Sequence, residues 1–149
     1  LGIMKSHLLV AAFFVFASVP IAAQVELQQS HIEANVPPAE SFDVFLNRDL
    51  LAYFKASDTP GATTVTYKPL RNGPTQSGVS YPKYYLWVKV LTGSKLSQEG
   101  AVRVAAIERT HFDVTNFMSK TQIQSAPAEV GNVFPAALVP SVLSLAGVK

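Results

Sequence analysis

The sequence YYLWVKVL at Tyr84–Leu91 decides the fold. Its β-branched and aromatic residues are typical of a strand, in which successive side chains point to opposite faces of a sheet. One face then carries Tyr84, Leu86, Val88 and Val90, and the other carries Tyr85, Trp87, Lys89 and Leu91. Both faces hold large apolar groups, but only the face with the lysine is expected to leave an aromatic surface free for a partner.

Three further segments share the two-residue period of strands: Thr63–Leu70, Val102–Glu108 and Phe112–Phe117. The Gly- and Ser-rich segment Thr92–Gly100 predicts a hairpin loop between the second and third strands, and a turn or bulge near Arg109–His111 precedes the fourth. Connections this short favour an antiparallel meander, because parallel strands need long crossover connections.

Helical periodicity precedes the strands. Within Ala39–Ala56, apolar side chains recur at spacings of three and four residues and form one wide stripe. The sequence SDTPG at Ser57–Gly61 then predicts the end of the helix. Asp49 lies close to the stripe, and we expect it to be a structural anchor that caps a neighbouring loop or pairs with Arg103. The alternative is a buried functional acid with a raised pKa.

A second helical region follows the strands. Ser119 and Gln122 have the spacing of a capping box, and an apolar helical face continues over 130–145. Pro135 and Pro140 conflict with one straight helix, because interior proline breaks the hydrogen-bond ladder. The fold class is therefore predicted to be α+β: an N-terminal amphipathic helix, a four-stranded antiparallel meander, and a C-terminal kinked or broken helix packed on the same sheet face.

The N-terminal residues are typical of a secretory signal peptide. Lys5 supplies a positive charge, Leu8–Val19 is an apolar run, and small residues follow up to Ala23. Since a membrane span needs about 20 apolar residues, we expect cleavage after Ala23, a periplasmic or extracellular location, and no stable membrane span after signal removal. An uncleaved anchor is the alternative. Leu1–Ile3 precede the first Met and are expected to be upstream read-through or an alternative start.

The chain thus divides into three parts. Residues 1–23 are assigned to the signal peptide, 24–38 to an N-terminal arm or linker with a short strand at Val25–Leu27, and 39–149 to a single α+β domain. A segment of that length suits one hydrophobic core.

Composition limits the chemistry. The 149-residue chain has a formal net charge of +2 and no cysteine. It therefore lacks disulfides, thiol nucleophiles and cysteine metal ligands, and nucleic acid is not expected as a partner. Phosphate-loop, dinucleotide and metalloprotease motifs are also absent from the sequence, so neither a cofactor nor a metal is predicted.

The segment Leu70–Lys83, LRNGPTQSGVSYPK, is longer than the two to five residues of most hairpin loops. Long ordered loops often carry function, and this one offers donors for an anionic or polyhydroxylated ligand beside strand aromatics. The predicted ligand- or partner-binding residues are Arg71, Asn72, Gln76, Ser77, Tyr81, Lys83, Tyr85 and Trp87. The alternative is a solvated hairpin tip whose Gly and Pro only set turn geometry.

A second cluster suggests acid–base chemistry. Its members are Glu108, Arg109, His111 and Asp113. A glutamate base, an arginine and a histidine acid would suit phosphodiester or ester hydrolysis, but Glu108 and Arg109 point to opposite faces of a strand unless a bulge intervenes. Each histidine of His31-x-Glu33 and His111-x-Asp113 could pair with its carboxylate on one face of a strand. Spacing names no third metal ligand.

We therefore expect a small exported binding domain without catalytic activity, whose partner is an envelope protein, a peptide or a saccharide. One alternative is a small secreted hydrolase or metal-dependent enzyme that uses the 108–113 cluster. Another is a structural component of an envelope assembly, with the apolar segment Phe134–Val148 inserted into a partner.

Overall fold

The computed structural model describes Gly2 and residues 18–149. The predicted signal segment at Lys5 and Leu8–Val19 lies almost entirely outside the described residues, so its cleavage and export stay predictions. In the described part of the chain, no helix has the length and hydropathy needed to cross a membrane.

Four strands form one antiparallel sheet in their order along the chain. They are β1 (Thr64–Pro69), β2 (Lys83–Thr92), β3 (Lys95–Ile107) and β4 (His111–Ser119). The predicted meander is therefore confirmed. β2 pairs with β3 along its whole length, from Lys83 opposite Ala105 to Thr92 opposite Lys95. β2 and β3 form the centre of the sheet, and β1 and β4 form its edges.

The connection between β2 and β3 is shorter than predicted. Only Gly93 and Ser94 link the two strands, and Gly93 has a φ of 61°. Tight hairpin turns need this left-handed backbone, which glycine adopts readily. The prediction of a loop over Thr92–Gly100 is wrong, because backbone pairing continues through polar residues that a hydrophobic pattern does not reveal.

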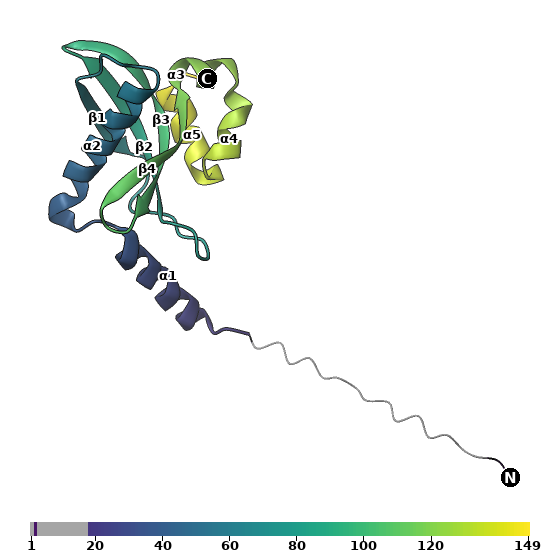
Figure 1. Cartoon of the computed structure of the whole chain (residues 1–149). Coiled ribbons are helices and arrows are strands. Elements are labelled where there is room, and N and C mark those ends of the chain that lie inside the picture. The colour runs from purple at the N-terminus through teal and green to yellow at the C-terminus, as the bar shows by residue number, and fades with distance from the viewer. Residues whose placement is uncertain (1, 3–17) are drawn as a thin grey trace.

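One face of the sheet is covered by α2 (Ala39–Ala56), which occupies its predicted range (Figure 1). Leu46, Leu50 and Phe54 are fully buried on this helix. They belong to one core with Val88 of β2 and its neighbours on β3. Complete burial of each such side chain stabilises the fold by about 1.5–3 kcal/mol.

The opposite face is covered by the C-terminal helices, so the domain has three layers (Figure 1). They are α3 (Lys120–Ser125), α4 (Val130–Val133) and α5 (Val139–Leu145), with 3₁₀ turns η1 (Pro127–Glu129) and η2 (Ala136–Leu138). Tyr85 and Trp87 of β2 pack against them. The prediction that both helical regions lie on the same sheet face is wrong. Because β2 is apolar on both faces, each face buries its own helical layer.

The C-terminal region is broken into short helices, as its prolines predict. Pro127 and Pro140 stand in the first turns of η1 and α5, and Pro135 precedes η2. The capping box is confirmed. Ser119 Oγ accepts from Gln122 N at 3.1 Å, and Gln122 Oε1 accepts from Ser119 N at 2.8 Å.

The predicted arm is instead a helix, α1 (Ile21–Asn35), which projects from the domain (Figure 1). The short strand predicted at Val25–Leu27 is therefore wrong. Helix-forming Ala, Glu and Gln dominate this segment, but it has no sustained apolar period to reveal the helix. Its C-terminal end is held by the β3–β4 turn, where Asn35 Oδ1 accepts from Glu108 N at 3.0 Å and Asn35 O accepts from Arg109 N at 2.9 Å.

Candidate functional site

The β1–β2 loop is folded by its own polar side chains. Thr75 and Lys83 form an isolated antiparallel β-bridge, and the Thr75 hydroxyl lies 3.0 Å from the Tyr85 hydroxyl. Gln76 Nε2 donates to the carbonyls of Gly78 and Ser80, so several predicted ligand donors serve the loop itself.

The remaining predicted loop residues differ in their accessibility. Lys83 Nζ donates to Tyr81 O at 2.7 Å, and burial, with repulsion from Arg103, lowers the pKa of Lys83. Arg71 is half-buried, with one guanidinium nitrogen that has no hydrogen-bond partner among the described residues. Asn72, Ser77 and Tyr81 are exposed. The loop thus presents its tip, rather than all of its donors, to a partner.

The strand aromatics are not free platforms. Tyr85 is 7% exposed and Trp87 is 4% exposed, because α3–α5 cover them. Trp87 nevertheless lines a groove at the point where this helical cover ends. The face with the lysine therefore remains the face of interest, although it offers a cationic groove rather than an aromatic surface.

Two adjoining pockets make up that groove. The first, of about 480 Å³, is lined by Thr66, Tyr67, Lys68, Trp87, Lys89, Glu99, Lys120 and Leu145. The second, of about 530 Å³, is lined by Lys68, Pro69, Leu70, Pro140, Ser141, Ser144 and Leu145. Because Lys68 and Leu145 line both pockets, the two form one groove between β1 and α5, which we call the lysine groove.

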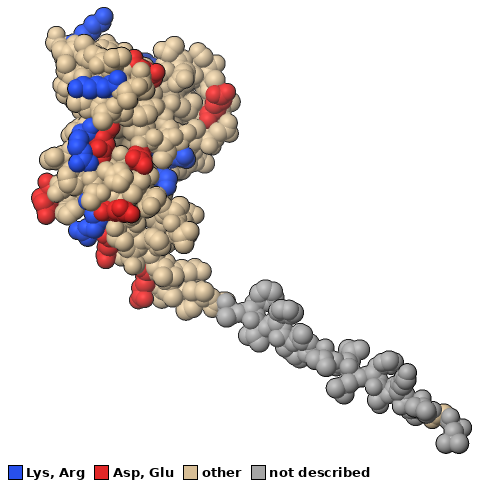
Figure 2. Space-filling view, in the orientation of Figure 1, with Lys and Arg blue, Asp and Glu red and all other residues tan. Residues whose placement is uncertain are grey.

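The sheet register brings the charges of the lysine groove together. Lys68 lies opposite Trp87, and Lys89 lies between Thr66 on β1 and Glu99 on β3. Lys120, from the start of α3, completes the set. Figure 2 shows, in one view, that charged side chains lie mainly over α2 and the sheet, whereas the C-terminal helices present a largely uncharged surface.

Internal pairing leaves this groove positive. Lys120 Nζ lies 3.2 Å from Glu99 Oε1, and Trp87 Nε1 donates to Glu99 Oε2 at 3.3 Å. Among the described residues, neither Lys68 nor Lys89 forms an ion pair. Three lysines against one glutamate give the lining a formal charge of +2. The groove therefore favours an anionic ligand.

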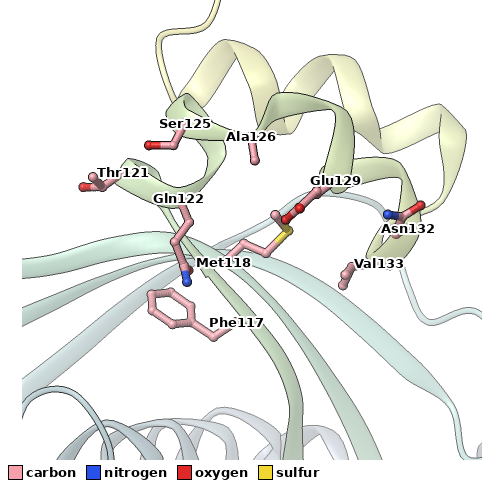
Figure 3. Close-up of a pocket in the computed structure, with 9 residues that line it drawn as sticks. All are labelled: Phe117, Met118, Thr121, Gln122, Ser125, Ala126, Glu129, Asn132 and Val133. Atoms are coloured by element: carbon pink, nitrogen blue, oxygen red, sulfur yellow. The ribbon is translucent and has the colours of Figure 1, made fainter.

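A second site lies between β4 and the C-terminal helices. This α3 pocket, of about 420 Å³, has Phe117 and Met118 rising from the strand and polar side chains on α3, η1 and α4 (Figure 3). Its members are Phe117, Met118, Thr121, Gln122, Ser125, Ala126, Glu129, Asn132 and Val133. One feature of the sequence points to this pocket, since Glu129 is the only acidic residue after Lys120.

The acid–base cluster at the β3–β4 turn has structural contacts that diverge. Glu108 and Arg109 adopt positive φ values of 50° and 64°, and Arg109 Nη1 donates to Glu33 O of α1 at 3.2 Å. His111 Nδ1 lies 2.9 Å from Thr110 Oγ1, whereas the exposed Asp113 lines a shallow pocket beside α2. Arg109, His111 and Asp113 thus have different neighbours. The described residues contain no group of three or more His, Asp or Glu side chains that could hold a metal ion.

Asp49 is an anchor for the strand that follows this turn. Its Oδ2 accepts from Phe112 N at 2.7 Å, while the neighbouring Arg48 donates to both carboxylate oxygens and to Thr110 O. The predicted capping role is therefore present, with Arg48 rather than Arg103 as the paired arginine. Arg103 instead donates to Thr115 Oγ1 at 2.9 Å.

Comparison with known proteins finds no relative that shares this fold or these sites. No protein-family model matches the chain, and neither the curated proteins nor the solved structures contain a match to it.

Proposed function

We propose that the protein is a non-catalytic binding domain that holds an acidic peptide segment of a partner protein in the lysine groove. The observation that carries this proposal is the convergence of Lys68 and Lys89, which have no carboxylate partner in the described part of the chain, beside a Glu99 that Lys120 already neutralises. An acidic side chain bound there would regain the charge pairing that the domain itself does not supply to these lysines.

The other walls of the groove favour a peptide. Leu70, Pro140 and Leu145 offer apolar contacts, and Ser141 and Ser144 offer hydroxyl groups. An extended peptide places successive side chains on opposite sides, which suits a groove with a charged end and an apolar wall. A saccharide would gain less, because the Trp87 ring is buried and cannot serve as a stacking platform.

Trp87 provides a local reporter of binding, since it is the only tryptophan and its indole nitrogen contacts Glu99 in the groove. Its fluorescence would be titrated with an end-blocked peptide of alternating Glu and Ala, and with a Lys–Ala peptide of the same length. We expect saturable binding of the acidic peptide only, and weaker binding at higher salt, because salt screens exposed charges.

Two charge-matched double variants locate the site. Lys68→Glu with Lys89→Glu is expected to weaken peptide binding at least tenfold. Lys55→Glu with Lys95→Glu changes the net charge equally at exposed positions outside the groove, and is expected to change the affinity less than twofold. Equal affinities of the two double variants would overturn the proposal. Tighter binding of an oligogalacturonate than of the acidic peptide would replace the peptide with an acidic saccharide.

We also propose that the domain acts after export, as an envelope or extracellular protein. The charge at Lys5, the apolar run and the small residues before Gln24 support this location. Mass spectrometry of the full chain after expression in a bacterium is expected to find a periplasmic protein that begins at Gln24, which would shorten α1 by its first three residues. A full-length chain recovered from the membrane fraction would contradict cleavage.

A further inference from the structure

The α3 pocket differs in charge from the lysine groove, although both use α3 as a wall. Lys120 lines the groove, whereas Thr121, Gln122 and Ser125 of the same helix line the pocket. Glu129 is the only charged residue that lines the pocket. Its carboxylate has no hydrogen bond or ion pair to any residue in the described part of the chain.

Two apolar side chains of the edge strand β4 line the pocket from opposite sides. Met118 is almost completely buried in the core beneath the C-terminal helices, whereas Phe117 packs with the α2 core, where its ring meets Phe54 edge-on at a centroid distance of 4.9 Å. Figure 3 shows Gln122 and Glu129 reaching from α3 and η1 toward these two side chains. Figure 3 shows the Glu129 carboxylate beside the Met118 thioether, with the Phe117 ring on the other side of the pocket. A carboxylate beside a polarizable sulfur, with an aromatic ring nearby, favours a cation, because the sulfur and the ring face are both electron-rich.

The polar rim limits the shape of the ligand. Gln122 Oε1 is already used in the capping box, which leaves its amide nitrogen facing the pocket, as Figure 3 shows. Thr121, Ser125 and Asn132 add neutral polar groups. A volume of about 420 Å³ lies within the range of small-molecule sites. We propose that the α3 pocket binds a small organic cation with an apolar body, such as an aromatic amine. Its ammonium group pairs with Glu129, and its apolar body lies against Met118 and extends toward the exposed side of Phe117.

The ε-methyl group of Met118 gives a direct test, because the chain contains only Met4 and Met118. NMR spectra of full-length protein labelled with methyl-¹³C methionine would be recorded during titration with benzylamine, and Met118→Leu would assign the signal. We expect a saturable shift of the Met118 signal with a Kd on the order of 1–10 mM, as is ordinary for so small a ligand. Benzyl alcohol and benzoate, which keep the ring but lack the positive charge, are expected to bind at least fivefold more weakly.

An isosteric pair of variants separates charge recognition from general effects. Glu129→Gln is expected to weaken benzylamine binding at least fivefold. Glu108→Gln removes the same charge from the exposed β3–β4 turn and is expected to have no effect. An unchanged Met118 signal in the free Glu129→Gln protein would show that the pocket itself is intact. Equal binding of benzylamine and benzoate, an unmoved Met118 signal in the wild type, or full affinity in Glu129→Gln would each overturn the proposal.

Discussion

Replacing Asp49 by alanine is expected to lower the free energy of unfolding by about 2–3 kcal/mol. Asp49 Oδ2 accepts from Phe112 N at 2.7 Å, and Phe112 is only 3% exposed. Leaving that buried N–H without an acceptor costs about 1–3 kcal/mol. The ion pair between Asp49 and Arg48 adds at most about 1 kcal/mol, because the Arg48 side chain is 50% exposed. The backbone hydrogen bond therefore dominates the expected loss.

Equilibrium urea unfolding at pH 7, followed by Trp87 fluorescence, measures this loss. Asp49→Asn keeps one carbonyl oxygen for Phe112 N and is expected to cost about 1 kcal/mol. Asp113→Ala serves as the control, because it removes an exposed carboxylate from the same strand, and it is expected to change the stability by less than about 0.5 kcal/mol. If Asp49→Ala were as stable as the wild type, or if Asp49→Asn were as damaging as Asp49→Ala, the anchoring role of the hydrogen bond to Phe112 would be refuted.

Three further predictions concern stability. Ser119→Ala removes the cap of α3 and is expected to cost about 0.5–2 kcal/mol in urea unfolding. Gly100→Ala would place a Cβ 2.2 Å from Met118 O and is expected to cost at least about 1–3 kcal/mol, whereas Gly131→Ala, with open space around it, should be neutral or stabilising; equal effects would contradict this packing. Burial raises the pKa of Tyr84 to about 12. In the unfolded chain the pKa of tyrosine is near 10, so the unfolded chain loses the phenolic proton at lower pH than the folded chain does. The free energy of unfolding should therefore fall between pH 10 and pH 12. Equal free energies of unfolding at pH 9 and pH 11.5 would contradict this prediction.

Local patterns in the sequence were sufficient to predict much of the fold. α2 occupies its predicted range because its apolar residues keep helical spacing, and the capping box at Ser119 follows from two residue types three positions apart. Hydrophobic periodicity does not predict α1, because the helix-forming residues of α1 show no sustained apolar period. The face covered by each helical layer was also missed, since β2 is apolar on both sides and its alternation does not say which helix lies where.

The candidate sites depend on contacts that no local pattern contains. Alternation placed Trp87 and Lys89 on one face, and that placement is confirmed by the groove. Lys68 and Lys120 join them only through strand pairing and the position of α3. Some of the loop donors that were predicted to bind a ligand instead stabilise the loop, for a related reason. Side chains such as Gln76 satisfy the loop backbone, and composition alone does not distinguish such self-pairing from ligand binding.

The two proposed sites have a common physical origin in the broken C-terminal region. One continuous helix would cover the second face of the sheet as evenly as α2 covers the first. Instead, prolines divide this region, and its longest helix, α5, has 7 residues. Short helices bury Tyr85, Trp87 and Met118 but leave Lys89 exposed and Phe117 partly exposed. The openings on either side of α3 form the lysine groove and the α3 pocket. α3 forms one wall of both sites, and Lys120 at the start of α3 pairs with Glu99. A ligand that displaces this ion pair in the lysine groove is therefore expected to shift the methyl signal of Met118 in the α3 pocket.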